Sequence, residues 1–229
     1  MLKAVTLVVA IGAGAFIPAQ AQRALRSEIS ASGPCCGTVT PGAQRVLELL
    51  DRSGVEQLWE NGSHVNWETG EADRPSNYQG PEMKTHCSAF AAAMGERLGV
   101  YMLRPPQHPQ ELLANAQTEW LGSPQGREAG WYEIASPEEA QLLANKGRLV
   151  VVSYQSPDPH HPGHIGIVRP DSKRTLEQIR ESGVLLTQAG ERNYLRVTEK
   201  VAFEHHPGAW PNGVRYFAND IPTSVSSRR

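Results

Sequence analysis

The chain lacks an apolar run long enough to cross a membrane, an excess of positive charge and any internal repeat. Its longest apolar stretch, Ala4 to Ile17, has about 14 residues, whereas a membrane-spanning helix needs roughly 20. The formal net charge is −2, and the Arg and Lys residues are scattered along the sequence without forming a basic face. These missing features argue against a membrane-spanning segment and against a nucleic-acid partner.

The first residues instead have the features of an export signal. Lys3 supplies a positive start, the apolar stretch follows it, and Ala19-Gln20-Ala21 supplies the small residues of a cleavage site. We therefore predict a signal peptide at 1–21, a secreted or periplasmic protein, and no membrane association once the signal is removed. A retained membrane anchor is the alternative interpretation.

The rest of the chain is long enough for one domain with its own core. Residues 22–40 are rich in Ser, Ala and Gly and predict a flexible leader, and residues 221–229 predict a disordered tail. The folded domain is expected at 41–220, as a monomer.

Within this domain, helix signals come first and strand signals follow. Periodicity with cap and stop residues predicts four helices. They run from Pro41 to Gly54 with Thr40 as cap, at 86–98 with Thr85 as cap, at 107–120, and from the cap Ser136 to Gly147. Short β-rich segments predict strands at 148–154, 163–168, 184–189, 194–203 and 214–217. This order favours an α+β fold, in which N-terminal helices pack on a five- or six-stranded antiparallel sheet.

Only three cysteines are present, an odd number for an exported protein. Cys35 and Cys36 are neighbours in the leader, and Cys87 stands alone at the start of a predicted helix. Either Cys87 pairs with one of the other two, or the two neighbours pair with each other or with a partner and leave Cys87 as a free thiol. The setting of Cys87 favours the second interpretation.

A free thiol in the first turn of a helix has a chemical use. Thr85-His86-Cys87-Ser88 places Cys87 in that turn, where unpaired N–H groups and the helix dipole favour the nucleophilic thiolate. His86 is expected to point away from it. The alternative is a buried cysteine that serves as a small apolar residue.

Histidine is the residue type that can take the thiol proton and return it to a leaving amine near neutral pH. His164 begins a predicted strand in which Ile165 and Ile167 face one side and His164, Gly166 and Val168 face the other. Gly166 leaves room beside the imidazole. His164 is therefore the candidate base, although a histidine at a strand start is often only a surface residue.

The base needs a third group to orient its ring. If strands 163–168 and 184–189 form a hairpin, His164 lies opposite Gln188, whose amide oxygen can accept the ring N–H. Glu191 and Asn193 follow on the same connection and remain alternatives for this role.

A cysteine that opens a helix of small residues, followed later by Gly-His-Ile-Gly-Ile-Val, resembles the papain-like cell-wall hydrolases. These include the cysteine, histidine-dependent amidohydrolases/peptidases (CHAP) and the related NlpC-type endopeptidases. The resemblance covers about residues 85–220 and keeps the order cysteine, histidine, polar residue. The third residue of the family is usually His, Asn, Asp or Glu, so Gln188 is a mild departure.

The resemblance implies a papain-like fold and hydrolysis of amide bonds in peptidoglycan, with no cofactor or metal. Relatives often take an oxyanion donor from a tyrosine roughly ten residues before the cysteine, where Tyr78 stands, and the Cys87 N–H is a second donor. Trp67 could line a groove for a glycan or peptide. Ordinary packing in a loop is the alternative for both aromatic residues.

Other histidines suggest alternatives that the sequence does not favour. His160 and His161, with His164 and Asp158 nearby, resemble a metal cluster, but the bracketing prolines prevent a helix from presenting the pair together. His205-His206 is interpreted as an exposed pair without a role.

These patterns together predict a secreted cysteine hydrolase that cleaves amide bonds, with peptidoglycan or another amide-containing polymer as its substrate. An acyl- or amide-transferase on the same fold is one alternative, because the two activities differ only in whether water or an amine reaches the acyl-enzyme. A secreted cell-wall-binding module without catalysis, in which Cys87 is structural, is the other.

Overall fold

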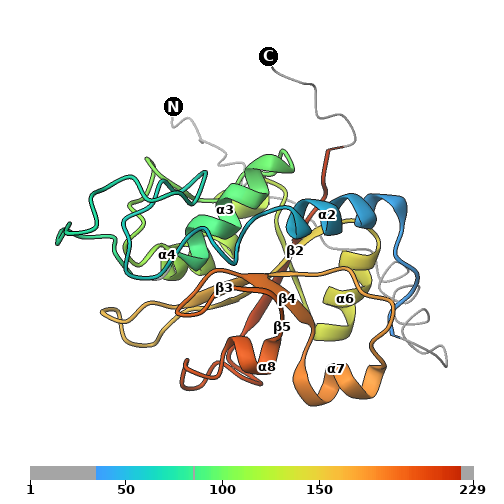
Figure 1. The fold of residues 1–229 in the computed structure, drawn as a ribbon. Coiled ribbons are helices and arrows are strands. Elements are labelled where there is room, and N and C mark those ends of the chain that lie inside the picture. The colour runs from blue at the N-terminus through green and yellow to red at the C-terminus, as the bar shows by residue number, and fades with distance from the viewer. Residues whose placement is uncertain (1–34, 85, 223–229) are drawn as a thin grey trace, which may run out of the picture.

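The computed structural model describes residues 35–84 and 86–222, which form an α+β domain (Figure 1). The predicted signal peptide at 1–21, the leader up to residue 34, the proposed cap Thr85 and the tail from residue 223 lie outside the described residues. Within the described ranges, no helix is long and apolar enough to span a membrane.

The centre of the domain is a six-stranded antiparallel sheet with the strand order β1-β6-β2-β3-β4-β5. The predicted α+β class and antiparallel sheet are confirmed. β-branched and aromatic residues are frequent in these segments and favour the pleated conformation. The strands are β1 Tyr132–Ile134, β2 Leu149–Tyr154, β3 His164–Val168, β4 Leu185–Gln188, β5 Tyr194–Thr198 and β6 Arg215–Asn219.

Helices accompany the sheet, and two of the predicted N-caps form as expected. The Thr40 hydroxyl accepts the Ala43 N–H at 3.2 Å, and the Ser136 hydroxyl accepts the Glu139 N–H at 3.2 Å. Each bond satisfies a backbone donor that a helix start leaves free. The described helices are α2 Pro41–Asp51, α3 Cys87–Arg97, α4 Leu113–Leu121, α5 Pro124–Glu128, α6 Pro137–Asn145, α7 Leu176–Ser182 and α8 Glu199–Ala202.

Two hydrophobic layers lie on opposite faces of the sheet. The first layer contains Ile165, Ile167 and Phe217 and includes residues of α3 and α4, whereas the second contains Val152 and Val168 and includes residues of α6, α7 and α8. Figure 1 shows α3 and α4 on one side of the sheet and α7 and α8 on the other. Because β2 and β3 are buried on both faces, their sequences are almost continuously apolar.

Several segments differ from the sequence prediction, which contains neither β1 nor α5. The third helix begins at Leu113 and not near residue 107, because three prolines in 105–109 interrupt the helical hydrogen-bond ladder. The strand predicted at 194–203 ends at Thr198, where α8 starts. The β3–β4 connection, predicted as a loop, contains α7, whose start carries a capping box formed by Thr175 and Gln178.

The cysteines pair as the second of the two interpretations expects. Cys35 and Cys36 form a disulfide with each other, and Cys87 is a free thiol. Both leader cysteines are buried in the second layer, which also contains Leu142. The Cys35 N–H donates to the Arg174 carbonyl at 2.8 Å. Residues 35–36 of the predicted leader are therefore packed on the domain.

One carboxyl group is enclosed in the second layer. Glu199 is fully buried, and its two oxygens accept hydrogen bonds from the Tyr216 hydroxyl at 2.5 Å and from the Val184 N–H at 3.2 Å. Burial raises the pKa of this carboxyl from its ordinary 4.5 to about 7, and the two hydrogen bonds oppose that rise only in part. The fold therefore favours the neutral acid.

The raised pKa of Glu199 predicts a stability that falls with rising pH. The unfolded chain releases this proton near pH 4.5 and the folded chain near pH 7, so the stabilisation is complete below pH 4.5 and is lost as the pH rises through 7. Between pH 5 and pH 8, wild type should lose about 2.5 kcal/mol of unfolding free energy relative to Glu199→Gln. Urea unfolding at the two pH values measures this difference.

Glu56→Gln, at an exposed glutamate, is the matched control and should follow wild type at both pH values. If Glu199→Gln and wild type showed the same pH dependence, the pKa of the buried carboxyl would not be raised.

Candidate active site

Cys87 is the first residue of α3, and the helix packs directly against β3. Small residues dominate the first turns of α3, so the strand can approach closely, and the Cys87 side chain is buried with 2 % exposed. His86 occupies the N-cap, and its Nε2 lies 2.8 Å from the Ser63 carbonyl oxygen. His86 therefore anchors the irregular segment that precedes α3.

Burial, more than the helix start, determines the protonation of this thiol. It raises the pKa of Cys87 from 9.0 to about 11, and the N–H groups of Ile165, Ser88 and Cys87 itself lower it only in part. The helix position alone predicts a thiolate, but in the structure the desolvation cost of a charged sulfur is the larger effect. At neutral pH the resting thiol is protonated.

His164, the first residue of β3, meets Gln188, the last residue of β4. Its Nε2 lies 2.7 Å from the Gln188 amide oxygen. Because an amide oxygen only accepts hydrogen bonds, Nε2 carries the hydrogen and Nδ1 keeps a free lone pair. The neutral ring is thus held in the tautomer whose Nδ1 can accept a proton, as a base requires.

This contact forms in a different register from the one that the sequence predicts. Ile167 pairs with Thr187, and the same pattern continued along the strands places Gly166, not His164, opposite Gln188. The Gln188 side chain therefore reaches His164 diagonally. A Cβ at Gly166 would lie in ordinary contact with the Gln188 amide oxygen, at 3.6 Å, and in tight contact with Leu186 Cδ1, at 3.1 Å.

Two aromatic rings from the segment around the end of α8 cover the His164 ring. His206 stacks on it with ring centroids 4.9 Å apart, and Phe203 meets it edge-on at 5.0 Å. Burial, and secondarily His206, lower the pKa of His164 to about 3. The sequence suggests no role for His206, because only the turn after α8 brings it to the site.

Cys87 and His164 come to the same end of β3 but do not bond to each other. The N–H of Ile165, the residue after His164, helps to lower the pKa of the thiol, and no hydrogen bond joins the thiol to the His164 ring in the part of the chain that the structure describes. The thiol belongs to the first layer, whereas the His164 ring packs on Phe203 of the second. The two side chains therefore lie on opposite faces of the sheet, and direct proton transfer between them requires the start of β3 to rearrange.

The two alternatives for the third residue, Asn193 and Glu191, are not hydrogen-bonded to His164 in the described part of the chain. The Asn193 side-chain oxygen, Oδ1, accepts the Gly190 N–H at 2.9 Å, and the side-chain NH2 donates to the Val55 and Leu58 carbonyls at 2.8 and 2.7 Å. Asn193 thus ties the β4–β5 turn to the segment after α2. Glu191 is exposed. Of the three candidates, Gln188 is the one whose side chain is hydrogen-bonded to His164.

Tyr78 and Trp67 contact residues other than Cys87. Tyr78 meets the His64 ring edge-on at 5.3 Å, and the Arg104 guanidinium lies 5.3 Å from the centre of the Trp67 ring. Among the described residues, no hydrogen bond or ring contact joins either side chain to Cys87. Their predicted oxyanion and groove roles are therefore not supported by a contact.

The loop before β3 does not assemble a metal site. His161 Nδ1 lies 2.7 Å from an Asp158 carboxylate oxygen, which is a single exposed pair. Within residues 35–84 and 86–222, no group of three His, Cys, Asp or Glu side chains is arranged to hold a metal ion.

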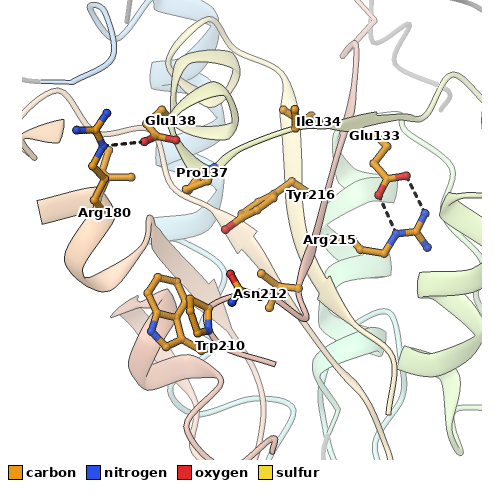
Figure 2. A pocket seen from close by; sticks show the side chains of 13 residues that line it. Glu133, Ile134, Pro137, Glu138, Arg180, Trp210, Asn212, Arg215 and Tyr216 are labelled. Atoms are coloured by element: carbon orange, nitrogen blue, oxygen red, sulfur yellow. Dashed lines mark hydrogen bonds and ion pairs between the residues drawn. The ribbon is translucent and has the colours of Figure 1, made fainter. Parts of the chain in front are cut away.

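Two surface hollows lie away from this site. One, of about 680 Å³, is lined by residues of β1, α6, α7, β6 and the 210–212 segment (Figure 2). The other, of about 800 Å³, lies where α2, α3 and α6 meet the residues after β6. Neither is lined by Cys87 or His164.

Comparison with known proteins identifies no relative of this chain: no protein-family model matches it, and no curated protein is significantly similar to it. The resemblance to papain-like cell-wall hydrolases therefore stays a prediction that rests on the sequence motifs.

The high thiol pKa predicts slow alkylation at neutral pH. From pH 7 to pH 10, the rate of Cys87 modification by iodoacetamide should rise about tenfold per pH unit, because the thiolate fraction does so below the pKa. Intact-mass spectrometry measures the rate, and Cys87→Ala corrects for other sites. His164→Ala should leave the profile unchanged, and a rate that levels off below pH 8.5 would contradict the raised pKa.

The His164–Gln188 contact predicts a specific effect of Gln188→Glu. A carboxylate in contact with the imidazole favours the imidazolium, so the pKa of His164 should rise from about 3 towards its ordinary 6.5. Titration of the histidine ring signals by NMR measures the change. Gln125→Glu, on exposed α5, is the matched control, and an equal His164 pKa in both variants would argue against the contact.

Proposed function

We propose that this protein is a cysteine hydrolase of amide bonds, with Cys87 as the nucleophile, His164 as the base and Gln188 as the residue that orients the base. The observation that carries the proposal is the 2.7 Å contact between His164 Nε2 and the Gln188 amide oxygen. It leaves Nδ1 as the acceptor on the first residue of β3, and the next residue, Ile165, is one of those whose N–H groups lower the pKa of Cys87.

The reaction has two halves. In the first, Nδ1 takes the thiol proton while sulfur bonds to the amide carbonyl carbon, and the C–N bond then breaks as the imidazolium protonates the leaving amine. In the second, Nδ1 takes a proton from water, whose oxygen attacks the thioester. The C–S bond breaks, the proton returns to sulfur, and the free acid leaves.

The resting pair is neutral in this mechanism. With the pKa of Cys87 at about 11 and that of His164 at about 3, the thiol keeps its proton until a carbonyl is in place. Attack and proton transfer are therefore coupled. The backbone N–H groups at the start of α3 can then stabilise the negative oxygen of the tetrahedral intermediate.

Peptidoglycan is the substrate class that the family resemblance indicates, either within the stem peptide or at its junction with the sugar. The predicted signal peptide fits such a substrate, because it directs the protein to the compartment where the wall lies. Every step of the proposed reaction uses only side chains, backbone N–H groups and water.

A cell-wall-binding protein in which Cys87 is structural is the second candidate. The observations that favour it are the burial of the thiol, its raised pKa and the missing bond to His164. A transferase shares the hydrolase chemistry up to the acyl-enzyme, and addition of an amine acceptor to the reaction distinguishes the two.

A hydrolase of this kind should release new amino groups from purified peptidoglycan. Cys87→Ala should abolish the release because no nucleophile remains, and His164→Ala should lower the rate about 10²- to 10⁴-fold, the usual contribution of a general base. Amine derivatisation and mass spectrometry of the soluble fragments measure the reaction.

His161→Ala is the matched histidine control, because the His161 ring is exposed and pairs with Asp158. It should retain the wild-type rate. Wall binding without amine release would favour the binding protein, and full activity in a folded Cys87→Ala variant would refute the assigned nucleophile.

A further inference from the structure

The smaller of the two hollows is a groove on the face of the sheet opposite to Cys87. It has a volume of about 680 Å³, which is in the usual range for small-ligand sites. Tyr216 of β6 lines it and belongs to the second layer, whereas the next residue, Phe217, belongs to the layer that contains Cys87. The sheet therefore separates the groove from the thiol.

The charged side chains that line this groove neutralise each other. Arg215 holds Glu133 through two hydrogen bonds of 2.8 Å, and Arg180 lies 3.3 Å from Glu138. Figure 2 shows the two pairs at opposite sides of the groove. With two cations and two anions, the lining has no net charge, which disfavours an anionic or cationic ligand.

Aromatic and neutral polar groups lie between the ion pairs. Figure 2 shows the Tyr216 ring in the middle, with Asn212 and Trp210 below it. The Tyr216 hydroxyl is held by Glu199 at 2.5 Å, which fixes the ring. In the described part of the chain, the Trp210 indole N–H and the Asn212 amide have no hydrogen-bond partner, so they are available to a ligand.

We propose that this groove binds a neutral oligosaccharide. Sugars present C–H faces that stack on aromatic rings, and hydroxyls that pair with amide, indole and charged side chains. An extended peptide would instead need a free strand edge for backbone pairing, and the adjacent edge strand β1 has only three residues. The combination of a rigid tyrosine, a partly buried tryptophan and balanced charge matches the sugar better.

Calorimetric titration of the mature protein with chitotetraose and cellotetraose tests this site. Saturable binding of at least one sugar is expected. Trp210→Leu should weaken it about tenfold, because the stacking face is lost, and Asn212→Ala about fivefold, because a hydrogen bond is lost. Trp120→Leu, at a partly buried tryptophan outside the groove, is the matched control and should bind like wild type.

The site is independent of the thiol chemistry, so Cys87→Ala should bind the sugars with wild-type affinity even if the proposed hydrolysis fails. Binding of neither sugar would overturn the proposal, as would affinities unchanged in both Trp210→Leu and Asn212→Ala. Saturable binding of a tetra-alanine peptide in place of the sugars would overturn it too, because the groove would then be a peptide site.

Discussion

The burial of β3 on both faces is the constraint on which the candidate site depends. All five residues of β3 are buried, and the strand pairs with β2 on one edge and β4 on the other. α3 covers one face and brings Cys87 to its start, while the segment around the end of α8 covers the ring of His164. A strand held on four sides cannot shift, so its first residue has a defined position.

The same burial governs the chemistry of the interior. It raises the pKa of the Cys87 thiol and of the Glu199 carboxyl and lowers that of the His164 imidazole, because in each case removal from water penalises the charged form. Arg169 shows what a buried charge requires. Its guanidinium is satisfied by the Thr187 hydroxyl, a backbone carbonyl and the Asp51 carboxylate. Cys87 has no comparable partner, so it rests as a thiol.

Tertiary structure also collects side chains that look unrelated along the chain. The two ion pairs of the groove that Tyr216 lines join positions far apart in sequence, such as Arg215 and Glu133. In the larger hollow, four cations that the sequence shows as scattered come from α2, the end of α3 and the connection between α6 and β2, and one of them, Arg148, pairs with Asp220. These four are Arg45, Arg97, Lys146 and Arg148.

The sequence by itself determined the α+β class and the caps at Thr40 and Ser136, which follow from two local signals, periodicity and cap residues. It favoured a free Cys87 and Gln188 as the contact of His164, but it left alternatives open for both. Only the tertiary structure decided the strand register, the stacking of His206 and the protonation of the site. Register and stacking depend on segments distant in sequence, and the thiol pKa depends on how completely those segments exclude water, which no local pattern encodes.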